Sequence, residues 1–285
     1  MKRDDADIPL LPVIAAEAMT LLRNPMVDFR DVTALIEKDQ RLAGQLIKIA
    51  NSPFYRSLYE VRGIRRAVTV IGLRGVTELI ASLAIGQKIF ANKMFEEKVK
   101  GLWEHSIGCA FLAQEIGGMR SDNAQDAFLV GLLHDIGKPL VLNIIAGRMK
   151  RRPEEYPAGP EMEAVADELM DEFHVAAGRS LGEHWRFPDN IMHAIRYHHN
   201  PLKEDIPFGP ALLAGVVDLY AHKFGLGVEP RDTDCSSHPW VSAFEFSAGE
   251  LREIESSLCG NARMIAMNTL NATVEETPEA AAAGA

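Results

Sequence analysis

The sequence of 285 residues predicts an all-α protein. Apolar residues recur at helical spacing, as Leu42, Leu46 and Ile49 do, which places them on one face of a helix. No convincing run alternates apolar and polar residues in the way that a half-buried strand does. Proline and glycine divide the periodic segments into lengths that are typical of helices. We therefore expect a bundle of helices rather than a sheet.

A first helical lobe is expected over residues 8–91. Pro12 is tolerated in the first turn of a helix, where its missing N–H is not needed. Asp39 is expected to cap a helix, because its side chain can accept from free backbone amides. A break is expected from Gly72 to Gly75. The helices predicted for this lobe are 13–23, 31–38, one that follows Asp39 and ends at Asn51, 64–71 and 76–90.

A second helical lobe is expected over residues 92–225, followed by a helical extension over 226–272. Prolines at 153, 157 and 160, and again at 201, 207 and 210, mark its two main loops. The last residues, 273–285, are low in complexity and are predicted to be disordered. The helices predicted after the first lobe are 94–117, 122–135, 138–146, 161–172, 174–186, 189–199, 209–223 and 248–270.

Composition excludes several classes of function. The formal net charge is −10 and the pI is about 5.4, so general affinity for nucleic acid or an anionic membrane is not expected. The three cysteines, at 109, 235 and 259, are spaced like neither a disulfide framework nor a zinc ribbon. The sequence shows neither a signal peptide nor a transmembrane span. We expect a cytoplasmic protein.

The segment from Val130 to Lys138 contains the only adjacent His-Asp pair, His134 and Asp135. It follows a strongly apolar stretch, and a buried carboxylate is costly unless it is paired or coordinated. Gly137 is expected to let the chain leave the helix in a left-handed turn. Lys138 would then lie close enough to approach a bound anion. The alternative is helix capping with a surface lysine.

The other candidate residues point inward from apolar helical faces. His105 shares a face with apolar residues, and Asp218 interrupts the apolar run 211–221, where a charge needs a partner. The alternatives are ordinary core or capping histidines and a buried ion pair at Asp218. We expect surface or capping roles for the remaining histidines, His184, His193, His222 and His238.

Together these residues suggest a metal site. Two imidazoles and two carboxylates suit a borderline or hard divalent ion such as Fe, Mn, Ni, Zn or Mg. The first set is His105, His134, Asp135 and Asp218. A second metal or a phosphate could be held by His174 with His198 or His199, and Lys138 and His174 could meet a phosphate group.

The order His, His-Asp, His, His-His, Asp resembles the HD superfamily of metal-dependent phosphohydrolases. The first lobe is similar to the HDOD domain, an HD-related output domain of bacterial signalling proteins. The resemblance covers roughly residues 8–225 and implies an all-α fold with an N-terminal helical lobe packed on an HD-like lobe. The segments that carry it are Leu11-Pro12, Ile36-Glu-Lys-Asp-Gln-Arg-Leu42, Leu46-Ile-Lys-Ile-Ala-Asn-Ser-Pro-Phe-Tyr55 and Ile64-Arg-Arg-Ala-Val-Thr-Val-Ile-Gly-Leu73.

Two functions follow from the resemblance. One is a regulatory HDOD protein that contacts other signalling proteins, with an HD-type site that can hold one or two divalent metals. The other is a metal-dependent phosphohydrolase acting on a nucleotide or another phosphate ester. A scaffold with an empty site is a third interpretation. The sequence also resembles HD-GYP cyclic di-GMP phosphodiesterases around His198-His199. It departs from them at Asn200-Pro-Leu-Lys203, which disfavours that activity.

Overall fold

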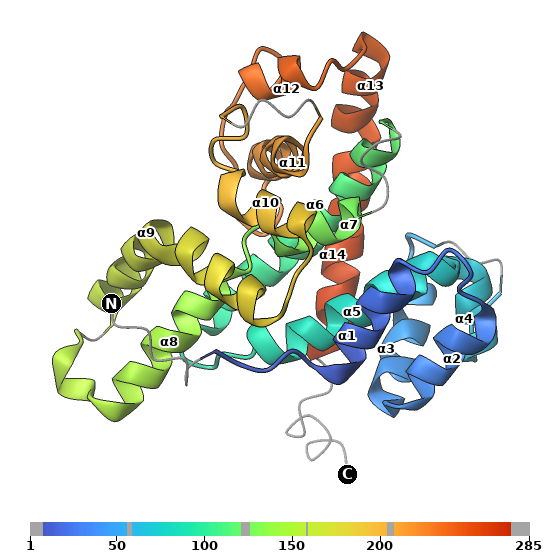
Figure 1. Cartoon of the computed structure of the whole chain (residues 1–285), viewed down its shortest axis with the longest axis horizontal. Coiled ribbons are helices and arrows are strands. Elements are labelled where there is room, and N and C mark those ends of the chain that lie inside the picture. The colour runs from blue at the N-terminus through green and yellow to red at the C-terminus, as the bar shows by residue number, and fades with distance from the viewer. Residues whose placement is uncertain (1–7, 56–58, 121–125, 158, 204–207, 275–285) are drawn as a thin grey trace. The chain divides into compact units, whose positions relative to one another are not determined.

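The computed structural model describes residues 8–55, 59–120, 126–157, 159–203 and 208–274 (Figure 1). Every regular element in these ranges is a helix, which confirms the predicted fold class. The chain forms two compact units. The N-terminal unit is Leu11–Lys88, to which the described residues 263–274 also belong. The HD-like unit is Ile89–Ala262, together with the described residues up to Leu10.

The N-terminal unit contains short helices around a buried core. Leu42, Leu46 and Ile49 are at most 1% exposed, which confirms the face predicted for them. Asp39 caps the third helix by accepting from the backbone N–H of Arg41, as predicted. The helices are α1 (Val13–Leu22), α2 (Phe29–Glu37), α3 (Gln40–Ala50), α4 (Ile64–Ile71) and α5 (Leu73–Ile89).

Two predicted helix starts in this unit are wrong. α2 begins at Phe29 rather than residue 31, because Asp28 and Asp31 form a reciprocal capping box. α5 begins at Leu73 rather than residue 76, because the break between α4 and α5 consists of Gly72 alone and does not extend to Gly75. Gly72 has a φ of +89°, which the lack of a Cβ permits, and the two flanking helices are bent by 107°.

The HD-like unit is built from longer helices. α6 packs on α7 and α11, α8 packs on α9, and α10 contacts both α9 and α11 (Figure 1). The helices are α6 (Glu96–Gly118), α7 (Ala127–Leu133), α8 (Gly137–Arg151), α9 (Pro160–His184), α10 (Asp189–Tyr197) and α11 (Pro210–Phe224). The C-terminal part adds α12 (Pro239–Ala243), α13 (Ala248–Glu253) and α14 (Cys259–Val274), of which α14 continues into the other unit.

Several boundaries differ from those predicted. The two helices predicted at 161–172 and 174–186 are one continuous helix, α9, since no proline or glycine lies near residue 173 to end it. The predicted long helix 248–270 is interrupted by a π-helical segment, Ile254–Leu258. Of the predicted tail, residues 273 and 274 end α14 and the remainder lies outside the described residues.

Two glycines let helices approach backbone to backbone on either side of the His-Asp pair. A Cβ on Gly131, in α7, would lie 2.2 Å from the carbonyl oxygen of Cys109 in α6. A Cβ on Gly137 would lie 1.8 Å from the carbonyl oxygen of His174 in α9. The predicted left-handed turn at Gly137 is wrong, because this residue opens α8 and has no positive φ. Its small size permits the close packing of α8 on α9.

One helical stretch among the described residues, Ala127–Arg151, has the length and composition of a membrane span, and the bent pair α4–α5 would qualify only as a single span. The window that meets the test in Ala127–Arg151 is 83% buried inside the protein. The stretch contains α7 and α8 of the HD-like unit. Such burial is typical of a helical stretch in the core of a folded unit.

Candidate metal centre

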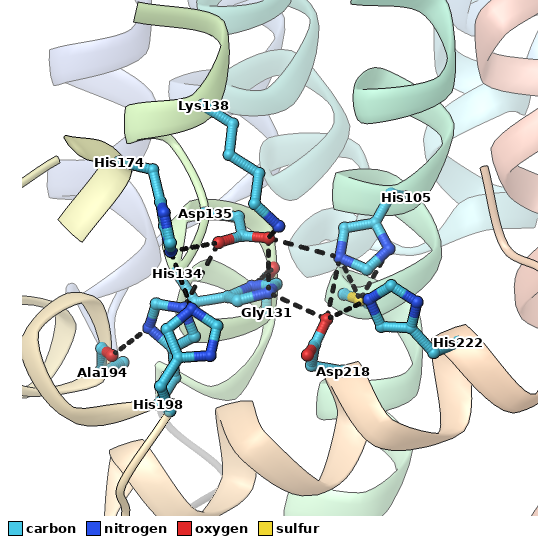
Figure 2. Close-up of polar contacts among 12 residues, drawn as sticks. His105, Gly131, His134, Asp135, Lys138, His174, Ala194, His198, Asp218 and His222 are labelled. Atoms are coloured by element: carbon cyan, nitrogen blue, oxygen red, sulfur yellow. Dashed lines mark hydrogen bonds and ion pairs between the residues drawn. The ribbon is translucent and has the colours of Figure 1, made fainter. Parts of the chain in front are cut away.

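The HD-like unit brings every predicted site residue into one cluster, and Figure 2 labels all of them except His199. Each contributing helix supplies one or two side chains, and the turn between α7 and α8 supplies the aspartate of the central pair. The residues are His105 from α6, His134 at the end of α7, Asp135 in the turn, Lys138 from α8, His174 from α9, His198 and His199 after α10, and Asp218 from α11.

Asp135 lies at the centre of the cluster, with histidines on both sides of its carboxylate (Figure 2). Its Oδ2 atom lies 3.7 Å from Nε2 of His105 and 3.6 Å from Nε2 of His134. Its Oδ1 atom lies 3.7 Å from Nε2 of His174 and 3.3 Å from Nε2 of His198. One carboxylate oxygen therefore faces each pair of imidazoles.

Asp218 completes the first of these two groups. Its Oδ1 atom lies 3.3 Å from Nε2 of His105 and 3.8 Å from Nε2 of His134. Two groups of ligand atoms result, and both include Asp135. Within each group, all the ligand atoms lie within 4.8 Å of one another. The first is His105, His134, Asp135 and Asp218, and the second is Asp135, His174, His198 and His199.

The backbone fixes the orientation of four imidazoles in the same way. In each, Nδ1 lies within hydrogen-bond distance of a carbonyl oxygen, which can only accept, so Nδ1 carries the proton and Nε2 presents a lone pair. Tethering of the distal nitrogen is typical of metal-binding histidines. The pairs are His105 with Leu226 at 3.2 Å, His134 with Gly131 at 2.8 Å, His174 with Met170 at 2.8 Å and His198 with Ala194 at 3.1 Å.

Several atoms that face the shared space have no hydrogen-bond partner. They are Nε2 of His134, Nε2 of His198, Oδ1 of Asp135 and Oδ1 of Asp218, all of them buried. An unsatisfied buried polar group costs about 1–3 kcal/mol, so four in one place need a common explanation. Nitrogen lone pairs and carboxylate oxygens that converge in this way fit a divalent cation, which would satisfy all of them.

The charged groups of the cluster stabilise one another. Burial alone would raise the pKa of Asp135, but the Lys138 ammonium holds that pKa well below its usual range. Burial likewise opposes ionisation of Asp218, and the adjacent His105 and His134 hold its pKa well below its usual range. Burial would lower the pKa of Lys138, but the two carboxylates raise it. Both carboxylates are therefore ionised at neutral pH.

His174 and His199 are neutral at pH 7. Burial lowers the pKa of His174, and burial with the nearby His198 lowers the pKa of His199 to about 4. Their Nε2 atoms lie 2.7 Å apart. Because Nδ1 of His174 donates to the backbone, His199 must donate through Nε2 and His174 must accept. His199 is the exposed member of this group.

Sequence analysis missed His222, for which it expected a surface or capping role. The side chain is only 13% exposed, and its Nε2 atom lies 3.6 Å from Oδ1 of Asp218 (Figure 2). Burial lowers the pKa of His222 to about 4. The available signal was its position four residues after Asp218, which places both on one face of α11. The same expectation is confirmed for His184, which is exposed, and for His238, which caps α12.

The HDOD domain family model matches residues 8–201, which is more than half of the chain. The matched residues include helices α1 to α5 of the N-terminal unit and the candidate ligands from His105 to His199, whereas Asp218 lies beyond the match. The protein belongs to the HDOD domain family.

The two curated relatives are much longer than the segments of them that match this chain. An uncharacterised protein of Treponema pallidum is 28% identical over 197 residues, which are 68% of this chain and 38% of that protein. Ribonuclease Y of Mycoplasmoides gallisepticum is 29% identical over 99 residues, which are 35% of this chain and 14% of that enzyme. The chain therefore spans well under half the length of these relatives.

Solved structures share the fold across nearly the whole chain. An HDOD domain protein of unknown function from Geobacter sulfurreducens is 24% identical, with a TM-score of 0.68 over 92% of this chain and 93% of that one. A candidate metal-dependent phosphohydrolase from Shewanella amazonensis is 20% identical, with a TM-score of 0.65 over 92% of each chain. A candidate signal transduction protein from Marinobacter aquaeolei is 22% identical, with a TM-score of 0.69 over 95% of this chain and 60% of that one. All three sequence identities are below 25%, so these similarities establish the fold alone.

Proposed function

We propose that the HD-like unit binds divalent metal ions, and that the protein is a bacterial signalling protein that acts through contacts with other proteins in the cytoplasm. One observation carries the metal-binding part. Four imidazoles are held by backbone carbonyls so that their Nε2 lone pairs converge on the two aspartates. No hydrogen-bond network needs this arrangement, since several of these atoms have no partner.

The types of ligand in the cluster restrict which ions it can bind. Imidazole nitrogens with carboxylate oxygens suit Fe, Mn, Ni, Zn or Mg. Because Asp135 offers one oxygen to each group of histidines, the arrangement has room for one ion on either side of this carboxylate. The Lys138 ammonium pairs with Oδ2 of Asp135 and would have to yield part of that contact to an ion.

The signalling part of the proposal rests on the family and on one structural neighbour, which is described as a candidate signal transduction protein. In this role the metal would tie α6, α7, α9, α10 and α11 together through their side chains. Such a crosslink stabilises the surface that a partner recognises, because an ion that binds only the folded state stabilises it by mass action.

Metal content tests the proposal. The protein should be purified without a His-tag or chelator and analysed by plasma mass spectrometry beside Asp135→Asn and a control, Asp232→Asn. Asp232 is exposed, and the substitution makes the same change of charge. We expect stoichiometric metal in the wild type and the control and its loss in Asp135→Asn. Metal-free wild-type protein, even after incubation with each of the five ions, would refute the proposal.

A second candidate function, hydrolysis of a phosphate ester, is favoured by the residues at the open side of the cluster. Lys138 is partly accessible, with 16% of its side chain exposed, and His199 is exposed. Lys138 could donate to phosphate oxygens, and His174 could donate to the same group through Nε2 once its ring is protonated, because in the neutral ring Nε2 only accepts. A bound divalent metal would supply an activated water and neutralise charge on the phosphoryl group. The neutral state of His199 leaves it able to accept a proton.

Turnover separates the two candidates. Metal-loaded protein should be assayed with an aryl phosphodiester, nucleotides and cyclic dinucleotides, beside Lys138→Met and the control Lys150→Met from the exposed face of α8. Hydrolysis that is lost in Lys138→Met and kept in Lys150→Met supports the enzyme. Stoichiometric metal without turnover of any of these substrates supports the signalling role alone.

A further inference from the structure

His105 differs from the other three tethered histidines in the origin of its carbonyl partner. The Nδ1 atoms of His134, His174 and His198 are bonded to carbonyls only three or four residues earlier in the chain. The partner of His105 is the carbonyl of Leu226, 121 residues further along. Local helix geometry therefore orients three of the rings, whereas the orientation of His105 depends on a contact between distant segments.

Leu226 is the middle residue of a tight turn, Gly225–Gly227, that ends α11. Both glycines have positive φ, at 63° and 66°, which residues with a Cβ rarely adopt. The N–H of Leu226 donates to the carbonyl of Ala221 at 2.9 Å, a bond typical of glycine-terminated helices. The Leu226 side chain is fully buried against α6, where a Cβ on Gly108 would lie 3.2 Å from it.

Gly227 allows this turn to lie directly against the backbone of α6. A Cβ on Gly227 would lie 2.1 Å from the carbonyl oxygen of Gly101 and 2.5 Å from the backbone nitrogen of His105. A Cβ on Gly101 would in turn lie 2.7 Å from the carbonyl oxygen of Gly227. All of these are backbone atoms, so the contact depends on the lack of a Cβ at both glycines.

α11 and the turn that ends it contact both nitrogens of the His105 ring. Oδ1 of Asp218 in α11 lies 3.3 Å from Nε2 (Figure 2), and the carbonyl oxygen of Leu226 lies 3.2 Å from Nδ1. Because the carbonyl can only accept, it holds the proton on Nδ1 and leaves the Nε2 lone pair beside Asp218. Asp218 and Leu226 both lie beyond residues 8–201, which the HDOD family model matches.

We propose that Gly227 is a positioning residue for the first group of ligands, because it docks the turn that orients His105. The inference rests on the metal binding proposed for this unit. The first group binds metal tightly only while the Gly225–Gly227 turn lies against α6. The second group does not depend on the turn, since local carbonyls orient His174 and His198. Metal binding by the first group and docking of the turn therefore strengthen each other by the same factor.

Zinc titration of the two groups separately tests the proposal. His198→Gln removes a ligand of the second group, and His134→Gln removes a ligand of the first. We expect Gly227→Ala to weaken Zn²⁺ binding about 10–100-fold in the His198→Gln protein, which is the usual cost of losing a contact that orients a ligand. In the His134→Gln protein the same substitution should leave the affinity unchanged.

The matched control is Gly118→Ala, at the end of the helix that carries His105. A Cβ on Gly118 would meet no atom within 4 Å, so both affinities should stay unchanged. Equal losses in the two proteins, or no loss in either with Gly227→Ala folded, would overturn the inference and leave the proposed metal binding in place. Absence of zinc binding by the wild type would overturn both.

A measurement on the wild type decides the case in which Gly227→Ala does not fold. Zinc-loaded protein with isotopically labelled histidine is studied by nuclear magnetic resonance, and His105→Gln identifies the signals of His105. We expect a slowly exchanging proton on Nδ1 of His105, with nuclear Overhauser effects to Leu226 or Gly227. A proton on Nε2, or a ring without contacts to the turn, would overturn the inference.

Discussion

The contact of α8 with α9 at Gly137 gives the sharpest prediction about how the fold positions the cluster. A Cβ at this residue would lie 1.8 Å from the carbonyl oxygen of His174 and 2.7 Å from the backbone nitrogen of Gly178. Both are backbone atoms, which cannot move aside as a side chain can. In Gly137→Ala, α8 and α9 must therefore separate by more than 1 Å, roughly the gap to an ordinary van der Waals contact.

The cost of this separation can be estimated. Overpacking a well-packed interior typically costs about 1–3 kcal/mol, and a backbone-to-backbone clash belongs at the upper end of that range. Asp135 lies two residues before Gly137, so the same movement should increase its 3.7 Å separation from His174. We expect Gly137→Ala to lower the free energy of unfolding by about 3 kcal/mol and to weaken metal binding at the position that includes His174.

A matched control lies on the same helix. A Cβ on Gly147 would have no atom within 4 Å, and this residue is interior to α8. Gly147→Ala should stabilise the protein by about 0.5–1 kcal/mol through helix propensity. Urea denaturation of the two variants and the wild type measures both effects, and calorimetric metal titration measures the second. Equal stability of Gly137→Ala and Gly147→Ala would refute the packing argument.

Three further predictions concern charge and capping. Lys138→Met removes an ammonium that competes for Asp135, so affinity for a divalent ion measured by calorimetry should rise about tenfold; unchanged or weaker binding contradicts the competition. The pKa of Glu250 is lowered from 4.5 to about 2 by Arg120, so this pair contributes about 1 kcal/mol above pH 4.5 that is lost as the pH falls toward 2. Acid titrations of stability should therefore converge for the wild type and Glu250→Gln, whereas a constant gap argues against the pair. Asp28→Ala removes an N-cap and should cost the N-terminal unit about 1 kcal/mol in denaturant unfolding; no measurable loss would show that the capping box is dispensable.

Local features of this fold could be predicted because they depend on nearby residues. The cap at Asp39 and the apolar face of α3 follow from side-chain chemistry and helical spacing, and both are present. The candidate ligands could be found from their order and from the cost of burying charge, as at Asp218. The two sets were also predicted from the sequence, but the position of Asp135 between them, shared by both, could not be predicted because it depends on how five helices pack.

The features that sequence analysis missed depend on long-range packing. A glycine at position 137 is typical of a helix end. In the structure its role is different, because it allows close contact with the backbone of His174, 37 residues further along the chain. His222 looks like a solvated helix end, and only the position of α11 against α6 buries it near His105.

The central claim is that tethered histidines and Asp135 bind a divalent metal. Crystals grown with the ion that copurifies, measured on both sides of its absorption edge, test this claim most directly. We expect an anomalous peak that marks a metal ion coordinated by Asp135 and by Nε2, rather than Nδ1, of His134 or His198. A cluster without a peak at saturating metal, or coordination through Nδ1 after the rings have left their backbone carbonyls, would contradict it.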